Sequence, residues 1–280
     1  MDGIILVNKP KGMTSHDVVN KLRKILHTKK VGHCGTLDPD ASGVLVVCIN
    51  KATKVLQFLT SENKEYITTL NLGTSTDTYD ASGVVLEIKE YQSIDNDKII
   101  NCIKSFVGEQ VQKPPMYSAI KVNGKKLYEY ARAGEAVEIP ERTINIDYID
   151  VLEIKNNLIK FKVGCSKGTY IRSLCFDIAA ALDYPGHMQE LIRTKSGKFS
   201  LNECYTLEQI ADGQFNCLNL ETALSDYQWL EVEDENIVYH GKKIKSDMNE
   251  QVVIVNKDKK VLAMYGPDGK GYLKNIRGLW

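Results

Sequence analysis

The stretch from Val31 to Asn50, VGHCGTLDPDASGVLVVCIN, constrains the fold of this chain more than any other. It joins a glycine-rich loop to an apolar run, Val44 to Ile49, of the kind typical of a strand buried on both faces. Pro39 has a fixed φ angle and also restricts the backbone of Asp38. The pattern therefore predicts a carboxylate held in a stiff turn on a rigid support.

Other interpretations of the same loop are plainer. Asp-Pro pairs and glycines also mark ordinary turns, and on local features alone that alternative stays open. The loop lacks the Gly-Lys-Ser/Thr ending of a phosphate-binding P-loop, which argues against a nucleotide site. His16, His27 and His33 occur at no spacing typical of metal ligands, so no metal site is predicted.

The composition limits the class of protein. A chain of 280 residues with 43% hydrophobic and 26% charged residues is typical of a globular protein with one large or two smaller domains. The seven cysteines include no C-x-x-C pair, so neither a disulfide framework nor a zinc ribbon is predicted. The first apolar run is too short for a signal peptide, and none reaches transmembrane length. We expect a cytoplasmic protein without membrane contact.

The charges balance at 36 basic and 36 acidic residues, but they are unevenly placed. Residues 201–240 carry nine acids and no Lys or Arg, whereas residues 241–280 carry nine Lys or Arg against four acids. Residues 1–30 carry seven Lys or Arg against two acids. Two basic ends of this kind can create a local RNA-facing field, although on charge alone solvated faces are the better explanation.

Hydrophobic periodicity predicts an α+β protein. Helices are expected after a cap at Thr14 or Ser15, over 53–59, over 96–107 and from Ile171 to Leu182. Strands are expected over 4–7, 66–72, 116–122, 144–154 and 158–165, with a primed turn at Asn123-Gly124. The tail segments 238–244, 250–266 and 271–276 are also predicted to be strands, which indicates a small β-rich module of about 50 residues.

Four motifs in this sequence match one family in the expected order. GHCGTLDPDASGVL at 32–45 resembles the catalytic-aspartate motif of the TruB family of tRNA pseudouridine synthases, and NKPKGMTSHDVV at 8–19 resembles its N-terminal signature. KEY at 64–66 and CSKGTYIRSL at 165–174 complete the series. The resemblance covers most of residues 1–200, and the tail is similar, more weakly, to an RNA-binding PUA-type domain.

The resemblance implies a fold and an activity. We expect a mixed, largely antiparallel sheet of the pseudouridine synthase type with flanking helices over residues 1–228, followed by a PUA-like domain over 229–280. The family converts uridine at position 55 in the T-loop of tRNA into pseudouridine by detaching the base, turning it and rejoining it through carbon. The resemblance implies the tRNA T-arm as partner, no cofactor, and a monomer without an obligatory protein partner.

The resemblance also assigns roles to residues. Asp38 would be the catalytic carboxylate, Tyr66 would stack on the extruded uracil, and Arg172 would hold Asp38 ionised and oriented. A cation in the first turn of a helix is slightly unfavourable, which by itself suggests a carboxylate partner for Arg172. The predicted substrate-binding residues are His33, Tyr170, Leu191, Lys9 and Pro10.

Two other functions remain open at this stage. An aspartate-dependent nucleoside or glycoside hydrolase would need a second carboxylate as acid, which the sequence does not identify. A non-catalytic RNA-binding or chaperone protein would tolerate loss of Asp38. Whether Asp38 attacks the sugar, attacks the base or promotes elimination is also open.

Overall fold

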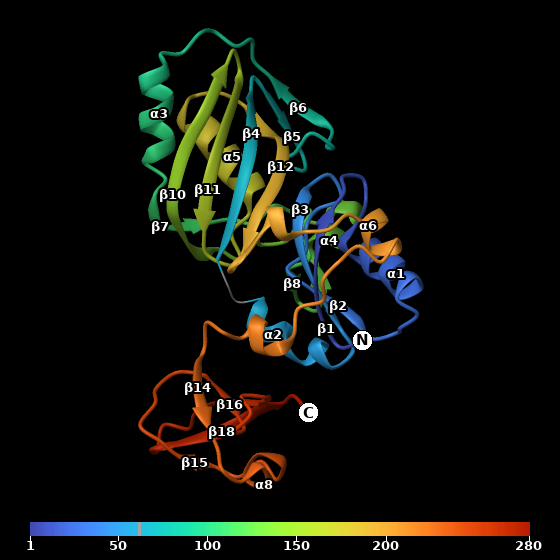
Figure 1. Cartoon of the computed structure of the whole chain (residues 1–280). Coiled ribbons are helices and arrows are strands. Elements are labelled where there is room, and N and C mark those ends of the chain that lie inside the picture. The colour runs from blue at the N-terminus through green and yellow to red at the C-terminus, as the bar shows by residue number, and fades with distance from the viewer. Residues whose placement is uncertain (61–62) are drawn as a thin grey trace.

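The computed structural model describes residues 1–60 and 63–280, and most strands in this part of the chain belong to two sheets (Figure 1). The larger sheet contains β1 (Gly3–Lys9), β2 (Val31–Cys34), β3 (Ser42–Ile49), β4 (Lys64–Leu72), β7 (Gly108–Gln112), β10 (Arg142–Lys155), β11 (Leu158–Cys165), β12 (Gly186–Ser196) and β13 (Phe199–Ser200). The smaller sheet contains β14 (Gln228–Glu231), β15 (Ile244–Lys245), β16 (Val252–Val255), β17 (Val261–Pro267) and β18 (Tyr272–Gly278). Two short hairpins pair β5 (Thr74–Thr76) with β6 (Val85–Ile88), and β8 (Lys121–Val122) with β9 (Lys125–Lys126).

Short helices connect and cover these strands. They are α1 (Ser15–Ile25), the 3₁₀ helix η1 (Asn50–Val55), α2 (Leu56–Leu59), α3 (Asn96–Lys104), α4 (Leu127–Ala133), α5 (Ile171–Ala181), the 3₁₀ helix η2 (Leu201–Glu203), α6 (Leu207–Ala211), α7 (Leu220–Ala223) and α8 (Glu235–Tyr239). The larger sheet follows the order β1-β3-β12-β4-β11-β10-β7, with β2 on β3 and β13 on β12. Its paired strands are antiparallel except β3 and β12. The predicted α+β class and the mixed, largely antiparallel sheet are confirmed.

Strand β3 is the buried strand that its apolar run predicts. Val44 to Ile49 are each at most 1% exposed, and β1 and β2 both pair with this strand. The chain passes from β1 to α1 through the basic turn at residues 9–12. Thr14 caps α1 in a capping box with Asp17, and Val18 and Leu22 pack below it against β1 and β3. This packing fixes the N-terminal segment beside the glycine-rich loop.

Helices α3 and α5 cover one face of the larger sheet (Figure 1). Apolar side chains from α3 (Ile99, Ile103), α5 (Leu174, Ile178) and the strands below form one buried cluster. Because side chains alternate along a strand, the neighbouring residues of β4, β10 and β12 point to the opposite face of the sheet. The first turn of α5 lies where this cluster meets the loop that precedes β3.

The C-terminal sheet shares a core with the rest of the chain. Val253 and Met264 belong to the same buried cluster as Phe58, Val46 and Leu224. This shared core follows from α2 and η1, which lie between the two sheets (Figure 1). The second side of the small sheet has its own cluster, which includes Val238, Tyr265 and Leu273.

Two element predictions were wrong in part. Residues 238–244 were expected to form a strand, but Val238 and Tyr239 end helix α8, which Asp234 caps through the backbone N–H of Asn236. The expected hairpin arm over 116–122 is a strand only at Lys121 and Val122. The primed turn is present, because Asn123 and Gly124 have φ angles of 51° and 83°.

Candidate active site

A cavity of about 880 Å³ lies between the loop that precedes β3, strands β4 and β12, and the start of α5. Of the predicted site residues, Asp38, Tyr66, Tyr170, Arg172 and Leu191 line it. These residues come from four separate elements of the chain, so the fold brings together what the motifs leave far apart. The volume is within the range of about 300–1,000 Å³ typical of small-ligand sites.

The turn that carries Asp38 is anchored by the N-terminal segment. The backbone N–H of Gly12 donates to the carbonyl of Pro39 over 2.9 Å. The Ser15 hydroxyl both accepts from the N–H of Leu37, at 2.9 Å, and lies 3.1 Å from its carbonyl. Asp38 is therefore held from both neighbouring positions.

Lys9, Pro10 and His33 do not line the cavity. Lys9 is fully buried, and its ammonium donates to the carbonyls of Pro10, Met13 and Pro39 at 2.9, 2.6 and 3.1 Å. Burial lowers its pKa to about 8. This geometry supports the turn that carries Asp38, while Pro10 is exposed at the surface beside it. Substrate contact by these residues stays a prediction.

His33 lies on β2, half-buried, next to the glycine-rich loop. Burial lowers the pKa of its imidazole, and the nearby Arg193 guanidinium lowers it further. His33 is therefore a neutral side chain near pH 7, and any contact with RNA would use its hydrogen-bonding or stacking capacity rather than a positive charge.

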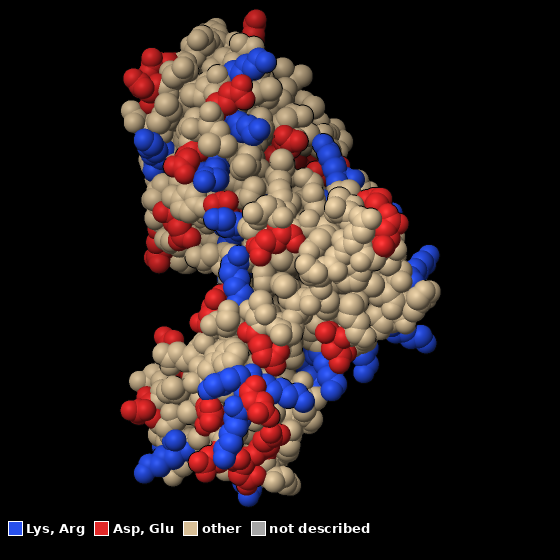
Figure 2. All heavy atoms as spheres, viewed as in Figure 1, with Lys and Arg blue, Asp and Glu red and all other residues tan. Residues whose placement is uncertain are grey.

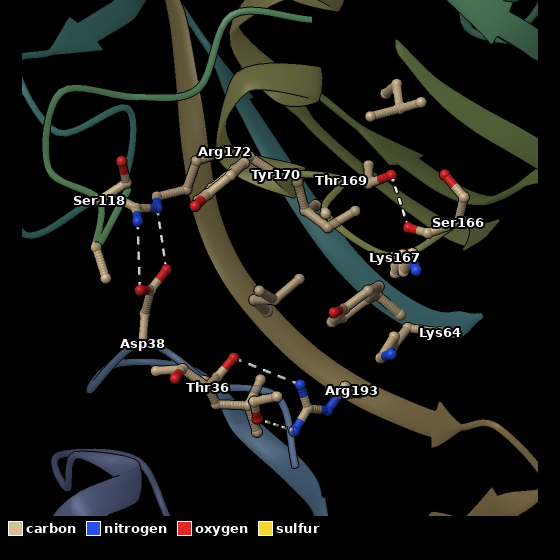
Figure 3. A pocket seen from close by; sticks show the side chains of 18 of the residues that line it. Thr36, Asp38, Lys64, Ser118, Ser166, Lys167, Thr169, Tyr170, Arg172 and Arg193 are labelled. Carbon is tan, nitrogen blue, oxygen red and sulfur yellow. Dashed lines mark hydrogen bonds and ion pairs between the residues drawn. The ribbon is translucent and has the colours of Figure 1, made fainter. Parts of the chain in front are cut away.

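Arg172 holds Asp38 through both carboxylate oxygens (Figure 3). Its Nε lies 3.0 Å from Asp38 Oδ2, and its Nη2 donates to Oδ1 over 3.3 Å. The other guanidinium hydrogens reach the carbonyls of Thr78, at 3.1 Å, and Tyr117, at 3.0 Å. Asp80 Oδ2 lies 3.6 Å from Nη1. The predicted pair of Arg172 and Asp38 is present in the structure, and the guanidinium contacts four residues.

Asp80 is a second carboxylate at this site that the sequence analysis missed. Its Oδ1 accepts hydrogen bonds from the hydroxyls of Thr78 and Ser82, at 2.8 and 2.6 Å, and from the N–H of Ser82. Its side chain is 13% exposed. No local motif marks this residue, and only its approach to Arg172 in three dimensions connects it with the site.

The electrostatic balance at Asp38 favours the protonated form more than an exposed aspartate would. Burial raises its pKa, and the charge of Asp80 adds to that rise, whereas Arg172 and Lys9 oppose it. The carboxylate still exposes 38% of its side chain toward the cavity. Arg172 thus orients Asp38, but the net pKa shift is upward, which makes the carboxylate a stronger base.

Arg193 is a second buried arginine that the sequence analysis missed. It is 1% exposed, pairs with Tyr66 across β12 and β4, and lines the cavity. Its Nε donates to the carbonyl of Val44 over 2.8 Å and its Nη2 to that of Gly35 over 3.0 Å. At Gly43 a side chain would collide with the backbone of Arg193, so a glycine is required where β3 meets β12.

The remaining walls are aromatic, apolar and basic. Tyr66 is buried, and burial raises the pKa of its phenol. Tyr170 caps α5, and the side-chain amide of Gln112 fixes its backbone at 2.9 and 3.1 Å. Figure 3 shows Asp38 and Arg172 on one side of the cavity, with Lys64 and Lys167 on the other. A cavity of this kind suits a planar base attached to a phosphate backbone.

Residues 1–60 and 63–280 contain neither a cluster of metal-binding side chains nor a membrane-spanning helix. No group of three or more His, Cys, Asp or Glu side chains in these ranges is arranged to hold a metal ion. No helix there is long and apolar enough to cross a membrane.

An aspartate held by an arginine, a buried tyrosine and a cavity on a mixed sheet are the arrangement expected of a pseudouridine synthase. Two solved structures have a similar fold. The fold matches a chain of a Cbf5-Nop10-Gar1 complex with a TM-score of 0.74 and 31% identity, covering 94% of this chain and 78% of that one. It matches a chain of an H/ACA RNP bound to a substrate RNA containing 2′-deoxyuridine with a TM-score of 0.76 and 27% identity, covering 99% and 85%.

The chain belongs to the TruB family. Residues 23–171 match the N-terminal domain of the TruB family pseudouridylate synthases, and residues 172–227 match the tRNA pseudouridylate synthase B C-terminal domain. The tRNA pseudouridine synthase B of Bacillus cereus is 43% identical over 100% of this chain and 97% of its own length. That of Halalkalibacterium halodurans is 45% identical over 98% and 96%. The chain is therefore an isomerase that converts uridine to pseudouridine.

Proposed function

We propose that this enzyme acts on uridine 55 in the T-loop of tRNA, as a monomer in the cytoplasm and without an obligatory protein partner. The observation that carries the proposal is the two-point contact between Arg172 and Asp38 at the wall of the cavity of about 880 Å³. The relatives named as tRNA pseudouridine synthase B support tRNA as the substrate.

The roles of the catalytic residues follow from their surroundings. Asp38 supplies the reacting carboxylate, and its raised pKa increases its basicity and nucleophilicity. Arg172 fixes both oxygens, so the reacting lone pair keeps one direction while the base turns. Tyr66 provides the aromatic face on which the extruded uracil stacks.

The substrate has to enter the cavity as an extruded nucleotide. A uracil stacked in the T-loop cannot present its glycosidic bond to Asp38, and extrusion costs a few kcal/mol that contacts with the loop must offset. Tyr170 and Leu191 would then contact the extruded nucleotide from the walls of the cavity. His33, Lys9 and Pro10 are proposed to act at the edge of the site, where they support or contact the RNA.

The C-terminal sheet is proposed to be an auxiliary RNA-binding unit. We place the boundary of the catalytic domain at residues 228/229, next to the end of the family match at 227. Figure 2 shows Lys and Arg side chains on this part of the molecule, mixed with acidic ones. Lys243 and Lys259 are paired with Asp268 and Glu231, so contact with phosphates would fall to the other cations of the PUA-like sheet.

A hydrolase is a weaker candidate on this geometry. It would require a carboxylic acid that donates a proton to the leaving group. Asp80, the second carboxylate that contacts Arg172, accepts three hydrogen bonds on one oxygen and faces Arg172 with the other. That environment suits a charged acceptor rather than a proton donor.

The decisive experiment incubates the purified protein with a T-arm stem-loop and maps the modified nucleotide. We expect pseudouridine at position 55 without added protein, guide RNA or cofactor. Release of free uracil would instead indicate a hydrolase. Tight binding without any product would indicate a chaperone, and product only with a guide RNA would indicate a guide-dependent enzyme.

A further inference from the structure

Glu65 lies between two residues that line the cavity, Lys64 and Tyr66, but points to the opposite face of the sheet. Its side chain is only 11% exposed, although it lies on the face of the sheet that does not line the cavity. A carboxylate so nearly buried has to be compensated by hydrogen bonds or opposite charges. Its partners explain why it lies there.

Both oxygens of Glu65 accept a hydroxyl group. Oε1 accepts from the Thr194 hydroxyl over 2.8 Å, and Oε2 accepts from the Tyr148 phenol. The ammonium groups of Lys195 and Lys162 lie 3.6 and 4.0 Å from Oε2. Burial alone would raise the pKa of Glu65, but the two hydroxyls and the lysines reverse this and lower it. The carboxylate is therefore charged at neutral pH, and both of its oxygens are occupied.

Each hydroxyl partner lies at an irregularity of its strand. Along β12, Arg193 pairs with Tyr66 and Lys195 with Glu65, so Thr194 is an extra residue, a β-bulge. Along β10, the register against β11 shifts between Ile146 and Tyr148. One carboxylate on β4 thus connects bulges on β12 and β10.

The bulge on β12 directly follows a cavity residue. Thr194, which Glu65 holds, comes immediately after Arg193, whose guanidinium holds the carbonyls of Gly35 and Val44. Those carbonyls belong to the loop and strand on either side of Asp38. A slip of the bulge would move Arg193 and with it the catalytic loop.

The bulge on β10 also depends on close packing. The Tyr148 ring crosses β11 at Gly164, where any larger residue would collide with it. This packing brings the phenol to Glu65 from two strands away, across the space that the missing side chain of Gly164 leaves open.

We propose that Glu65 is a positioning residue for pseudouridine formation, which joins the bulges of β10 and β12 and thereby fixes Arg193 and the loop of Asp38. The inference rests on the proposed function for its kinetic consequence. Glu65 does not touch the substrate, so its removal should affect the reaction rate and leave RNA affinity nearly unchanged.

The test compares Glu65→Gln and Tyr148→Phe with the parent at saturating T-arm RNA. A glutamine keeps the shape but cannot accept from both hydroxyls, so we expect a single-turnover rate at least about tenfold lower and a Kd within about twofold. Thr194→Val should add little to Glu65→Gln, because both changes break the same connection. Glu153→Gln is the matched control: Glu153 is an exposed glutamate of β10 without a hydrogen-bond or ion-pair partner in residues 1–60 and 63–280.

Hydrogen exchange provides a readout that does not depend on activity. The amides of residues 35–41 should exchange about tenfold faster in Glu65→Gln and Tyr148→Phe, but not in Glu153→Gln. If the parent makes no pseudouridine, the proposed function fails, and the exchange data still decide the role of Glu65. Unchanged exchange in both variants would overturn the inference, as would parental rates in both. If Glu65→Gln does not fold, Tyr148→Phe decides alone.

Discussion

Arg172→Lys should lower the catalytic rate about 100-fold although the charge is conserved. The guanidinium makes four contacts of 3.0–3.3 Å, two to Asp38 and two to the carbonyls of Thr78 and Tyr117. A lysine ammonium is a single point charge and cannot hold both carboxylate oxygens and both carbonyls from one position. The carboxylate of Asp38 would therefore rotate more freely than it does in the parent enzyme.

The magnitude follows from the hydrogen bonds that a lysine cannot make. A hydrogen bond to a charged group contributes about 1.5–3 kcal/mol. The ammonium has three N–H groups for four acceptors and cannot match the planar fork of the guanidinium, so we expect about two of these contacts to be lost. Only the part that is stronger in the transition state affects the rate, so about 3 kcal/mol of the total is a reasonable share. Since about 1.4 kcal/mol is a factor of ten, the rate should fall about 100-fold.

The assay is single-turnover pseudouridine formation at saturating T-arm RNA. Arg142→Lys is the matched control, since Arg142 also lines the cavity but makes no hydrogen bond or ion pair to a carboxylate in the part of the chain described. We expect the control within about threefold of the parent. An Arg172→Lys rate within the same range would refute the clamp, even if Asp38 proved essential.

The remaining predictions concern Asp38, pH, metal and the tail. Asp38→Asn should abolish product and leave the Kd for RNA near that of the parent. Its melting temperature should not fall, because the raised pKa of Asp38 means that the charged form costs stability at neutral pH, a cost that an amide removes. The rate of the parent enzyme should fall as the pH drops through the raised pKa of Asp38, with a midpoint above 3.8. Asp80→Asn should move that midpoint down, because the charge of Asp80 raises the pKa. A parent midpoint at or below 3.8 would contradict the raised pKa. Activity should survive EDTA when the RNA stays folded, and loss restored by zinc would contradict a metal-free site. Lys274→Glu with Arg277→Glu on β18 should weaken tRNA binding and flatten its salt dependence, whereas Lys98→Glu with Lys104→Glu on α3 should not; equal effects would argue against a local RNA contact.

The shared core of the two sheets changes how the tail should be tested. Deleting the chain from residue 231 would remove Val253 and Met264, which pack with Val46 and Phe58 of the catalytic part. The exposed cluster would destabilise the protein whatever the tail contributes to binding. Charge substitutions on the surface of β18 avoid this, because Lys274 and Arg277 are exposed.

The sequence was sufficient for the parts of the site that lie in contiguous motifs. Asp38 precedes a buried strand that its apolar run reveals, and Arg172 opens a helix that its periodicity reveals. A cation at a helix N-terminus suggests a carboxylate partner, and the family resemblance implied that this partner is Asp38. The structure places the pair at distances that fit a bidentate contact.

The parts that could not be predicted depend on register and on chain crossings. Arg193 faces the cavity by its alternation with Leu191 on β12, but a pattern in the sequence alone does not show which face of the strand lines a cavity, and it does not reveal the bulge at Thr194. Asp80 lies in a polar turn whose sequence fits any surface loop. The tail segment at 238–244 reads as a strand by composition, but the cap at Asp234 starts a helix before it.

The site also shows why one arginine has to serve two carboxylates. Burial raises the pKa of Asp38 and the charge of Asp80 raises it further, whereas the positive charge of Arg172 opposes both. A cation that paired with Asp38 alone could neutralise its basicity as well. Arg172 also contacts Asp80 and two carbonyls, which fix its guanidinium, so it sets the direction of Asp38 while burial keeps the pKa of Asp38 raised. The arrangement therefore separates orientation from basicity, which a simple ion pair could not do.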